Sequence, residues 1–295
     1  MRIGIDLGGT KIEAVVMSAQ GEIVLRRRIP SPAENYIRIV DAIVDLVATL
    51  EGELGAACQI GIGTPGAPSL GTGLMKNCNS TEMNNKPLLR DLEQRLGREI
   101  RMANDANCFA LSEAIDGAGR HGASVFGVIL GTGVGGGLVI DQRLQIGRNA
   151  IGGEWGHIPM PRVSERRSCY CGQYDCVETY LCGGGLLRTA RQYLPDLHDS
   201  RELASLAEAG HLEAQSVLRT YSQQLASALA IVVNIVDPDV IVLGGGVSNI
   251  SALYDTLPEL MSAAVFGNDY RTDILPARYG DSSGVRGAAW LWPAM

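Results

Sequence analysis

The chain has 295 residues, of which 46% are hydrophobic and 19% charged, a composition typical of a globular protein with about two domains or lobes. The net charge of −7, with only three lysines, argues against nucleic acid or an anionic membrane surface as a partner. No apolar run approaches about 18 residues and the N-terminus lacks the apolar core of a signal peptide, so we expect a cytoplasmic protein without a membrane anchor.

In chain order, alternating and three-and-four apolar spacings predict strands and helices that follow one another along the sequence. Strands are expected at residues 1–5, 12–17, 59–63, 100–103, 125–130, 138–140 and 240–243. Helices are expected at residues 33–54, 87–97, 104–116, 212–236, 253–266 and 284–292. The segment 146–182 is expected to be irregular. This alternation is typical of an α/β protein.

A glycine turn joins the first two expected strands and contains Asp6, Gly8, Gly9, Thr10 and Lys11. The glycines leave backbone N–H groups open to an anion, and Thr10 adds a hydroxyl. Asp6 stands at the end of the strand, where a carboxylate can hold Mg²⁺ through water. These groups together indicate a nest for nucleotide phosphates, and an ordinary tight hairpin is the alternative.

The same layout of strand, glycine turn and strand returns at residues 131–137. Gly131, Gly133 and Gly136 have the spacing of a dinucleotide-binding fingerprint, but that fingerprint requires a helix after the turn, and here a strand is expected. We therefore interpret this segment as a second phosphate-binding turn. Its recurrence indicates that two lobes arose by duplication, and a simple glycine-rich hairpin tip is the alternative.

Two further segments carry polar groups suited to sugar chemistry. Asn104 and Asp105 stand where an expected strand meets an expected helix, so Asp105 is either the helix N-cap or a general base for a hydroxyl being phosphorylated. The amide of Asn104 can hold an adjacent hydroxyl. Farther along, Glu154 can accept two sugar hydroxyls, and His157 can bind sugar or metal or be structural.

The cysteines at 169, 171 and 176 give the sharpest local pattern in the chain. Their C-x-C-x₄-C spacing, together with His157 twelve residues upstream of Cys169, supplies a Cys₃His set. Such a set fits tetrahedral Zn²⁺ with no open position and predicts a structural zinc site, with free or disulfide-bonded thiols as the alternative. Glu178, two residues after Cys176, is expected to be held against whatever the metal loop packs on.

A last glycine run, Gly244-Gly245-Gly246-Val247, follows a strand of the buried type and precedes an expected helix. Adenine and ribose can lie against such a bare backbone. Close packing of strand and helix explains the same glycines equally well, so the residues alone leave both interpretations open.

In their order and combination, these segments resemble the ROK family of sugar kinases, named for repressor, open reading frame and kinase. The resemblance extends over essentially the whole chain. It implies the two-lobed actin-like ATPase fold, which is ribonuclease H-like, with a cleft between the lobes and a zinc-binding loop. We expect a small lobe of residues 1–117 plus a C-terminal helix at 281–295, and a larger lobe of residues 118–280 with the zinc-binding segment at 157–176. A homodimer is common in the family.

The resemblance also implies the roles of individual residues, with ATP, Mg²⁺ and a structural Zn²⁺ as cofactors. Asp105 is the implied catalytic base. The implied nucleotide-binding residues are Asp6, Gly8, Gly9, Thr10, Lys11, Gly131, Thr132, Gly133, Gly135, Gly244, Gly245, Gly246 and Val247. The implied sugar-binding residues are Gly66, Asn104, Asp105, Glu154, His157 and Glu178. The implied zinc ligands are His157, Cys169, Cys171 and Cys176, so that one ring nitrogen of His157 faces the metal and the other the sugar.

Within the family, segments 233–246 and 280–293 are most similar to bacterial fructokinases of the mannokinase kind. This similarity implies ATP-dependent phosphorylation of the 6-hydroxyl of a hexose, with fructose as the first candidate and mannose as the second. Because neither segment lines a sugar site, glucokinase and N-acetylmannosamine kinase are alternatives, as is a non-catalytic sugar-sensing protein. Repressors of the family carry a DNA-binding helix-turn-helix ahead of the first glycine turn, and we expect none here because Asp6 is so near the start.

Overall fold

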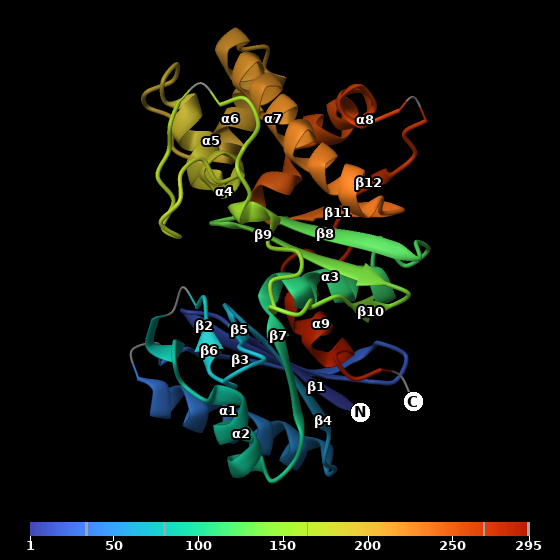
Figure 1. The fold of residues 1–295 in the computed structure, drawn as a ribbon. Coiled ribbons are helices and arrows are strands. Elements are labelled where there is room, and N and C mark those ends of the chain that lie inside the picture. Colours follow the sequence, from blue (N-terminus) through green and yellow to red (C-terminus); the bar gives the residue numbers. More distant parts are fainter. Residues whose placement is uncertain (33–34, 79–80, 164, 268, 294–295) are drawn as a thin grey trace. The chain divides into compact units, whose positions relative to one another are not determined.

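A computed structural model describes residues 1–32, 35–78, 81–163, 165–267 and 269–293 (Figure 1). The chain divides into two compact units. Unit 1 comprises Met1–Arg120, Gly137–Gly152 and Arg278–Met295, and unit 2 comprises His121–Gly136 and Gly153–Ala277. Compared with the lobes expected from the sequence, the segment 137–152 is grouped with the N-terminal part of the chain.

Unit 1 is built on a five-stranded sheet with the strand order β3-β2-β1-β4-β7. Its strands are β1 (Arg2–Leu7), β2 (Lys11–Met17), β3 (Ile23–Pro30), β4 (Gln59–Thr64) and β7 (Ile100–Asn104). A small separate sheet consists of β5 (Ala67–Pro68) and β6 (Met75–Lys76). The helices are α1 (Tyr36–Leu54), α2 (Leu88–Leu96), α3 (Asp105–Ile115) and α9 (Ser283–Trp290), with short 3₁₀ turns η1 (Thr81–Met83) and η4 (Gly280–Ser282).

Large apolar residues and glycines alternate along β1 and β4, and this alternation decides which helices cover each face of the sheet. Ile3 and Ile5 belong to the same hydrophobic core as α1 and α2. On the other face, a Cβ atom added at Gly4 or Gly61 would overlap the backbone of α9. These two glycines therefore let α9 lie directly on the strands, and α9 in turn packs against α3.

Strand β3 is absent from the sequence-based expectation, because its IVLRRRIP sequence lacks an apolar alternation. It is an edge strand with mostly exposed side chains. Arg26 and Arg28 reach from it to Glu13 on β2, whose side chain is only 4% exposed. The strand is thus held by charge pairing to its neighbour, and charged edges of this kind also discourage pairing with other chains.

A second five-stranded sheet has the order β10-β9-β8-β11-β12, and the boundary between the units falls within β9. Its strands are β8 (Ser124–Leu130), β9 (Val134–Ile140), β10 (Arg143–Leu144), β11 (Val240–Gly244) and β12 (Asp273–Pro276). The helices of unit 2 are α4 (Glu178–Leu181), α5 (Gly183–Ala190), α6 (Ser200–Glu208), α7 (Leu212–Val236) and α8 (Ala252–Ala264), with 3₁₀ turns η2 (Trp155–His157) and η3 (Gly246–Asn249).

The two sheets share one plan. Each begins with three strands that are consecutive in the chain and neighbours in the sheet, and each adds two later strands on the side of the first. The added strands are parallel in both cases, β1 to β4 to β7 and β8 to β11 to β12. This repeated order supports the duplication inferred from the two glycine turns.

Helix α7 is confirmed over the full predicted range, residues 212–236. Its apolar positions, Tyr221 and Leu225 among them, are buried, and the helix ends at Asp237 in the left-handed conformation just before Pro238. Helix α1 begins at Tyr36, and residues 33 and 34 of the helix expected at 33–54 lie outside the described residues. Within the described ranges, we find no helix with the length and apolar character needed to span a bilayer.

Candidate active site

The first glycine turn connects β1 to β2, as predicted. The N–H of Gly8 donates to the carbonyl of Lys11 at 3.0 Å, which closes the turn and removes this donor from the set expected to face a ligand. Gly9 and Thr10 are exposed, and in the described part of the chain no hydrogen bond involves their N–H groups. The turn therefore offers fewer free donors than the sequence indicated, with Gly9 and Thr10 at its tip.

Two carboxylates of unit 1 lie close enough to influence each other. Burial raises the pKa of Asp6 to about 6, and the charges of Asp105 and Glu13 add to this effect. Desolvation by the surrounding protein also raises the pKa of Asp105, and its backbone hydrogen bonds oppose this effect. Burial raises the pKa of the Cys108 thiol, and the negative charges of Asp6 and Asp105 add to this effect. Paired carboxylates of this kind favour a divalent cation.

The start of helix α3 separates the roles of its first two polar residues. The side-chain oxygen of Asn104 accepts from the N–H of Asn107 at 2.7 Å, so Asn104 is the N-cap of α3. Asp105 accepts from the N–H of Ala106 at 2.8 Å through one oxygen. Because capping is done by Asn104, the carboxylate of Asp105 is not needed for it, and the amide nitrogen of Asn104 is left to donate to a ligand.

Gly66 lies beside the small β5–β6 sheet. A Cβ atom there would overlap the carbonyl of Lys76 and lie 2.7 Å from the Cys78 sulfur. The carbonyl of Gly66 accepts from the Thr64 hydroxyl at 2.6 Å. Packing alone therefore requires a glycine at this position, and its contact with sugar stays a prediction.

The second glycine turn is shorter than the sequence indicated, since β9 already begins at Val134. The later glycines serve the packing of Trp155, whose Nε1–H donates to the carbonyl of Gly135 at 2.9 Å. A Cβ atom at Gly136 would lie 2.6 Å from the indole ring. Gly131 donates its N–H to Gly133 at 3.0 Å, so Thr132 and Gly133 are left with unbonded N–H groups among the described residues.

Glu178 is held directly against this turn. Its Oε2 atom accepts from the N–H of Val134 at 2.9 Å. A Cβ atom at Gly133 would lie 2.6 Å from the same oxygen. The glycine at 133 therefore makes room for the carboxylate, and Glu178 joins the helix after the cysteine cluster to the turn predicted to bind phosphate. The sequence alone gave no signal of this contact.

The glycine run at 244–247 divides into packed and open positions. Gly245 has a φ of 83°, and a Cβ atom there would lie 2.5 Å from the carbonyl of Leu130. Val247 is only 2% exposed. Gly246 has nothing near its missing side chain and borders a cavity of about 130 Å³. The cavity is lined by Gly246, Asn249, Ile250 and residues of α6, namely Ser200, Arg201, Ala204, Ser205 and Glu208. Both interpretations of the run thus have support: Gly245 is required for close packing, and Gly246 borders a space in which a ligand can lie.

The predicted metal ligands come together in unit 2. The ligand atoms of His157, Cys169, Cys171 and Cys176 all lie within 4.8 Å of one another. His157 Nδ1 is 3.7 Å from the Cys169 sulfur, and the sulfurs of Cys171 and Cys176 are 3.6 Å apart. Neighbouring ligands of a tetrahedral zinc are about 3.8 Å apart, so this donor set fits Zn²⁺ in both chemistry and spacing.

The orientation of His157 refines the role predicted for it. Because Nδ1 faces the thiols, Nε2 is the ring nitrogen left for another partner. That nitrogen lies 3.1 Å from the hydroxyl of Tyr170. The Tyr170 hydroxyl therefore either competes with the sugar for the Nε2 atom of His157 or bridges that atom to the sugar. Sequence reasoning did not single out Tyr170.

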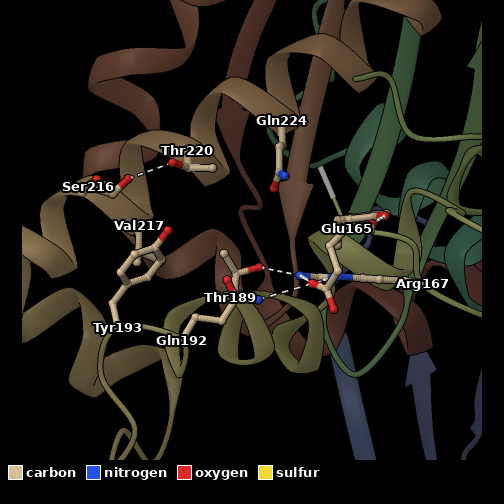
Figure 2. A pocket seen from close by; sticks show the side chains of 10 residues that line it. Glu165, Arg167, Thr189, Gln192, Tyr193, Ser216, Val217, Thr220 and Gln224 are labelled. Atoms are coloured by element: carbon tan, nitrogen blue, oxygen red, sulfur yellow. Dashed lines mark hydrogen bonds and ion pairs between the residues drawn. The ribbon is translucent and has the colours of Figure 1, made fainter. Parts of the chain in front are cut away.

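Arg167 anchors the metal-binding segment to the body of unit 2. This side chain is 3% exposed and donates to the carbonyls of Thr179 and Gly185, to the Thr189 hydroxyl, and to Glu165. Figure 2 shows Arg167, Glu165 and Thr189 at the wall of a cavity of about 120 Å³. None of the predicted site residues lines that cavity, and the arginine that borders it is bonded within the protein, so we assign this space to the anchoring of the loop.

Two sheets of the same strand order, each with a glycine turn after its first strand, define the two-lobed α/β fold of the actin-like ATPases. A model of the ROK family matches residues 2–295, and the chain belongs to this family. This finding confirms the family resemblance and the fold class inferred from the sequence.

Individual relatives match over the full length of the chain. The N-acetyl-D-glucosamine kinase of Escherichia coli O6:H1 is 38% identical, with 99% of each chain covered. Among solved structures, a ROK hexokinase from Thermus thermophilus is 32% identical with a TM-score of 0.87, covering 98% of this chain and 96% of the other. A ROK family glucokinase from Streptomyces griseus, solved with glucose and AMPPNP, is 30% identical with a TM-score of 0.80 and 98% coverage of both.

Proposed function

We propose that this protein is an ATP-dependent sugar kinase that phosphorylates the 6-hydroxyl of a hexose. The observation that carries the proposal is the position of Asp105, an exposed carboxylate at the start of α3 that does not serve as the helix N-cap. Full-length similarity to sugar kinases supports it. A non-catalytic sugar sensor needs neither such a base nor two glycine turns with unbonded N–H groups.

In the proposed reaction, the oxygen of the sugar hydroxyl bonds to the γ-phosphorus of ATP, and Asp105 accepts the proton of that hydroxyl. The bond between the γ-phosphorus and the β-phosphate oxygen breaks, so ADP leaves. The amide nitrogen of Asn104 donates to a neighbouring sugar hydroxyl. Glu154 and Glu178 accept from others. ATP would supply the phosphoryl group, and Mg²⁺ would offset the negative charge of the phosphates. Asp6 would hold Mg²⁺ through water, and the N–H groups of the glycine turns would hold the phosphates.

Zinc has a supporting role in the proposal. When bound by the Cys₃His set it would fix the segment 157–176, because no position is left open for chemistry. The cavity beside Gly246 is the place proposed for the nucleoside end of ATP.

Fructose is the first candidate acceptor, with mannose next. This order follows the resemblance of segments 233–246 and 280–293 to bacterial fructokinases, which concerns kinship, since neither segment lines a sugar site. N-acetyl-D-glucosamine is the second candidate, because relatives with that activity are 38% identical over 99% of the chain. Glucose and N-acetylmannosamine complete the group that family membership favours.

The test is a coupled assay of ADP release with purified protein, ATP, Mg²⁺ and each of these five sugars, followed by identification of the phosphorylated carbon. We expect turnover with at least one sugar and a 6-phosphate product, with the largest kcat/KM for fructose. A larger value for N-acetyl-D-glucosamine would replace the acceptor but keep the reaction. Absence of sugar-dependent ADP release across the panel would contradict the kinase proposal.

The base assignment is tested by Asp105→Asn, which preserves shape but cannot accept the proton. We expect kcat to fall by a factor of about 10² to 10⁴, with sugar affinity retained. Calorimetric titration with the preferred sugar measures the affinity. Near-normal turnover by Asp105→Asn would show that another group takes the proton.

A further inference from the structure

Tyr170 occupies an unusual place between two of the proposed zinc ligands, Cys169 and Cys171. Its hydroxyl is 3.1 Å from His157 Nε2. The two rings also meet edge to face, with centroids 5.3 Å apart and an angle of 85°. Two independent contacts therefore fix the phenol against the ring nitrogen that does not face the thiols.

Tyr170 is linked to the proposed sugar site through His157. Glu154 is the residue before the 3₁₀ turn Trp155–His157, and its carbonyl accepts from the N–H of His157 at 3.4 Å. Tyr170 is 78% exposed, so a ligand can reach its phenol.

Other tyrosines of this segment have structural explanations that Tyr170 lacks. Tyr180 is 2% exposed, and its hydroxyl is bonded to the Asp175 carboxylate at 2.7 Å. The ring of Tyr174 lies along the guanidinium of Arg166, with the charge 3.9 Å from the ring centre. Tyr170 contacts His157 and leaves most of its surface in solvent. Packing does not require a large aromatic residue there.

A hydroxyl bonded to one ring nitrogen still has capacity for another partner. With Nδ1 facing the metal site, a neutral His157 carries its proton on Nε2 and donates to the tyrosine oxygen. The phenolic O–H is then left to donate to a sugar oxygen. We propose that the Tyr170 hydroxyl, oriented by His157, makes the direct sugar contact that the sequence assigned to His157 itself. This inference rests on the proposed function, since it adds a substrate-binding residue to that site.

The test compares Tyr170→Phe with Tyr174→Phe, which removes a hydroxyl from the same segment at an exposed ring away from His157. We expect Tyr170→Phe to weaken sugar binding about five- to tenfold in calorimetry and to raise KM by a similar factor, with kcat little changed. Tyr174→Phe should bind as the wild type does. Zinc content, measured by elemental analysis, should be equal in all three proteins, which excludes a loss caused by metal release.

Unchanged or tighter sugar binding by Tyr170→Phe overturns the inference, because the hydroxyl would then be absent from the contact or would block it. Equal weakening in both variants also overturns it, since a general effect on the loop would be the cause. A wild-type protein that binds sugar without turnover contradicts the kinase proposal but leaves the binding comparison decisive. A wild-type protein that binds none of the sugars overturns both.

Discussion

The carboxylate of Asp6, which is proposed to hold Mg²⁺ through water, lowers the stability of the ligand-free fold at neutral pH. In the folded chain it is partly buried near Asp105 and Glu13, and its pKa rises from 3.8 to about 6. The folded state therefore holds a proton that the unfolded state releases between about pH 4 and 6. Above pH 6 the ionised carboxylate costs the fold on the order of 2 to 3 kcal/mol, and this cost disappears as the pH falls toward 4.

We predict that Asp6→Asn stabilises the ligand-free protein at pH 8 and abolishes most of its kinase activity. The amide has the same shape but no charge to bury, and it cannot hold Mg²⁺ through water as a carboxylate does. Urea unfolding at pH 8 and pH 4.5 checks the first part. The gain should be clear at pH 8 and small at pH 4.5. Asp45→Asn, at an exposed position of α1, is the control. A gain independent of pH would show that the charge of Asp6 is not its source.

At the scale of elements, the contact between α3 and α9 positions Asp105, the proposed base. A Cβ atom at Gly287 would overlap the carbonyl of Cys108, three residues after Asp105 on α3. The backbones of the two helices therefore touch with no side chain between them. The same α3 is fixed at its other end, where Glu113 accepts from the Ser283 hydroxyl at 2.7 Å. These contacts set the position of Asp105 relative to its own unit.

We predict that Gly287→Ala destabilises the protein by about 1 to 3 kcal/mol and lowers kcat, because α3 must shift to admit the methyl group. Gly52→Ala in α1 is the matched control. Its Cβ atom would meet nothing within 4 Å, so this change should stabilise the helix by about 0.5 to 1 kcal/mol. Thermal unfolding and turnover measure both effects. Wild-type kcat in Gly287→Ala would separate the α3–α9 contact from catalysis.

The zinc segment is the second element that supports the proposed site. Its ligands come from residues 157–176, and Glu178 follows at once and bonds to Val134 at the glycine turn. We predict that removing the metal raises the KM for sugar and increases amide hydrogen exchange across 157–182. Arg167, which is bonded to α5 independently of the metal, should keep the later helices protected. Unchanged kinetics after verified metal loss would contradict the supporting role.

The elements that could be predicted from sequence are those with a strong internal pattern. Helix α7 repeats its apolar residues over 25 positions, and its boundaries were correct. Strand β3 and helix α6 were missed, because the first is held by arginines paired with Glu13 and the second buries a single residue, Leu203. The candidate site shows the same division. The cysteine spacing led to the metal cluster, whereas the bond from Val134 to Glu178 depends on strands that are distant in sequence.

For the whole molecule, ligand binding offers a test that does not depend on turnover. A ligand that binds only the folded state adds about 2.7 kcal/mol at one hundred times its Kd, which corresponds to a rise of roughly 5 °C in the unfolding midpoint of a chain this size. We predict such a rise for the true acceptor, fructose before N-acetyl-D-glucosamine, at equal concentrations. Asp105→Asn should retain the shift, and Glu154→Gln should lose most of it. If ATP with Mg²⁺ shifts the midpoint but no sugar of the panel does, the chain binds nucleotide without a hexose acceptor. If sugars do shift the midpoint, their ranking by midpoint must match their ranking by kcat/KM for the proposed reaction to hold.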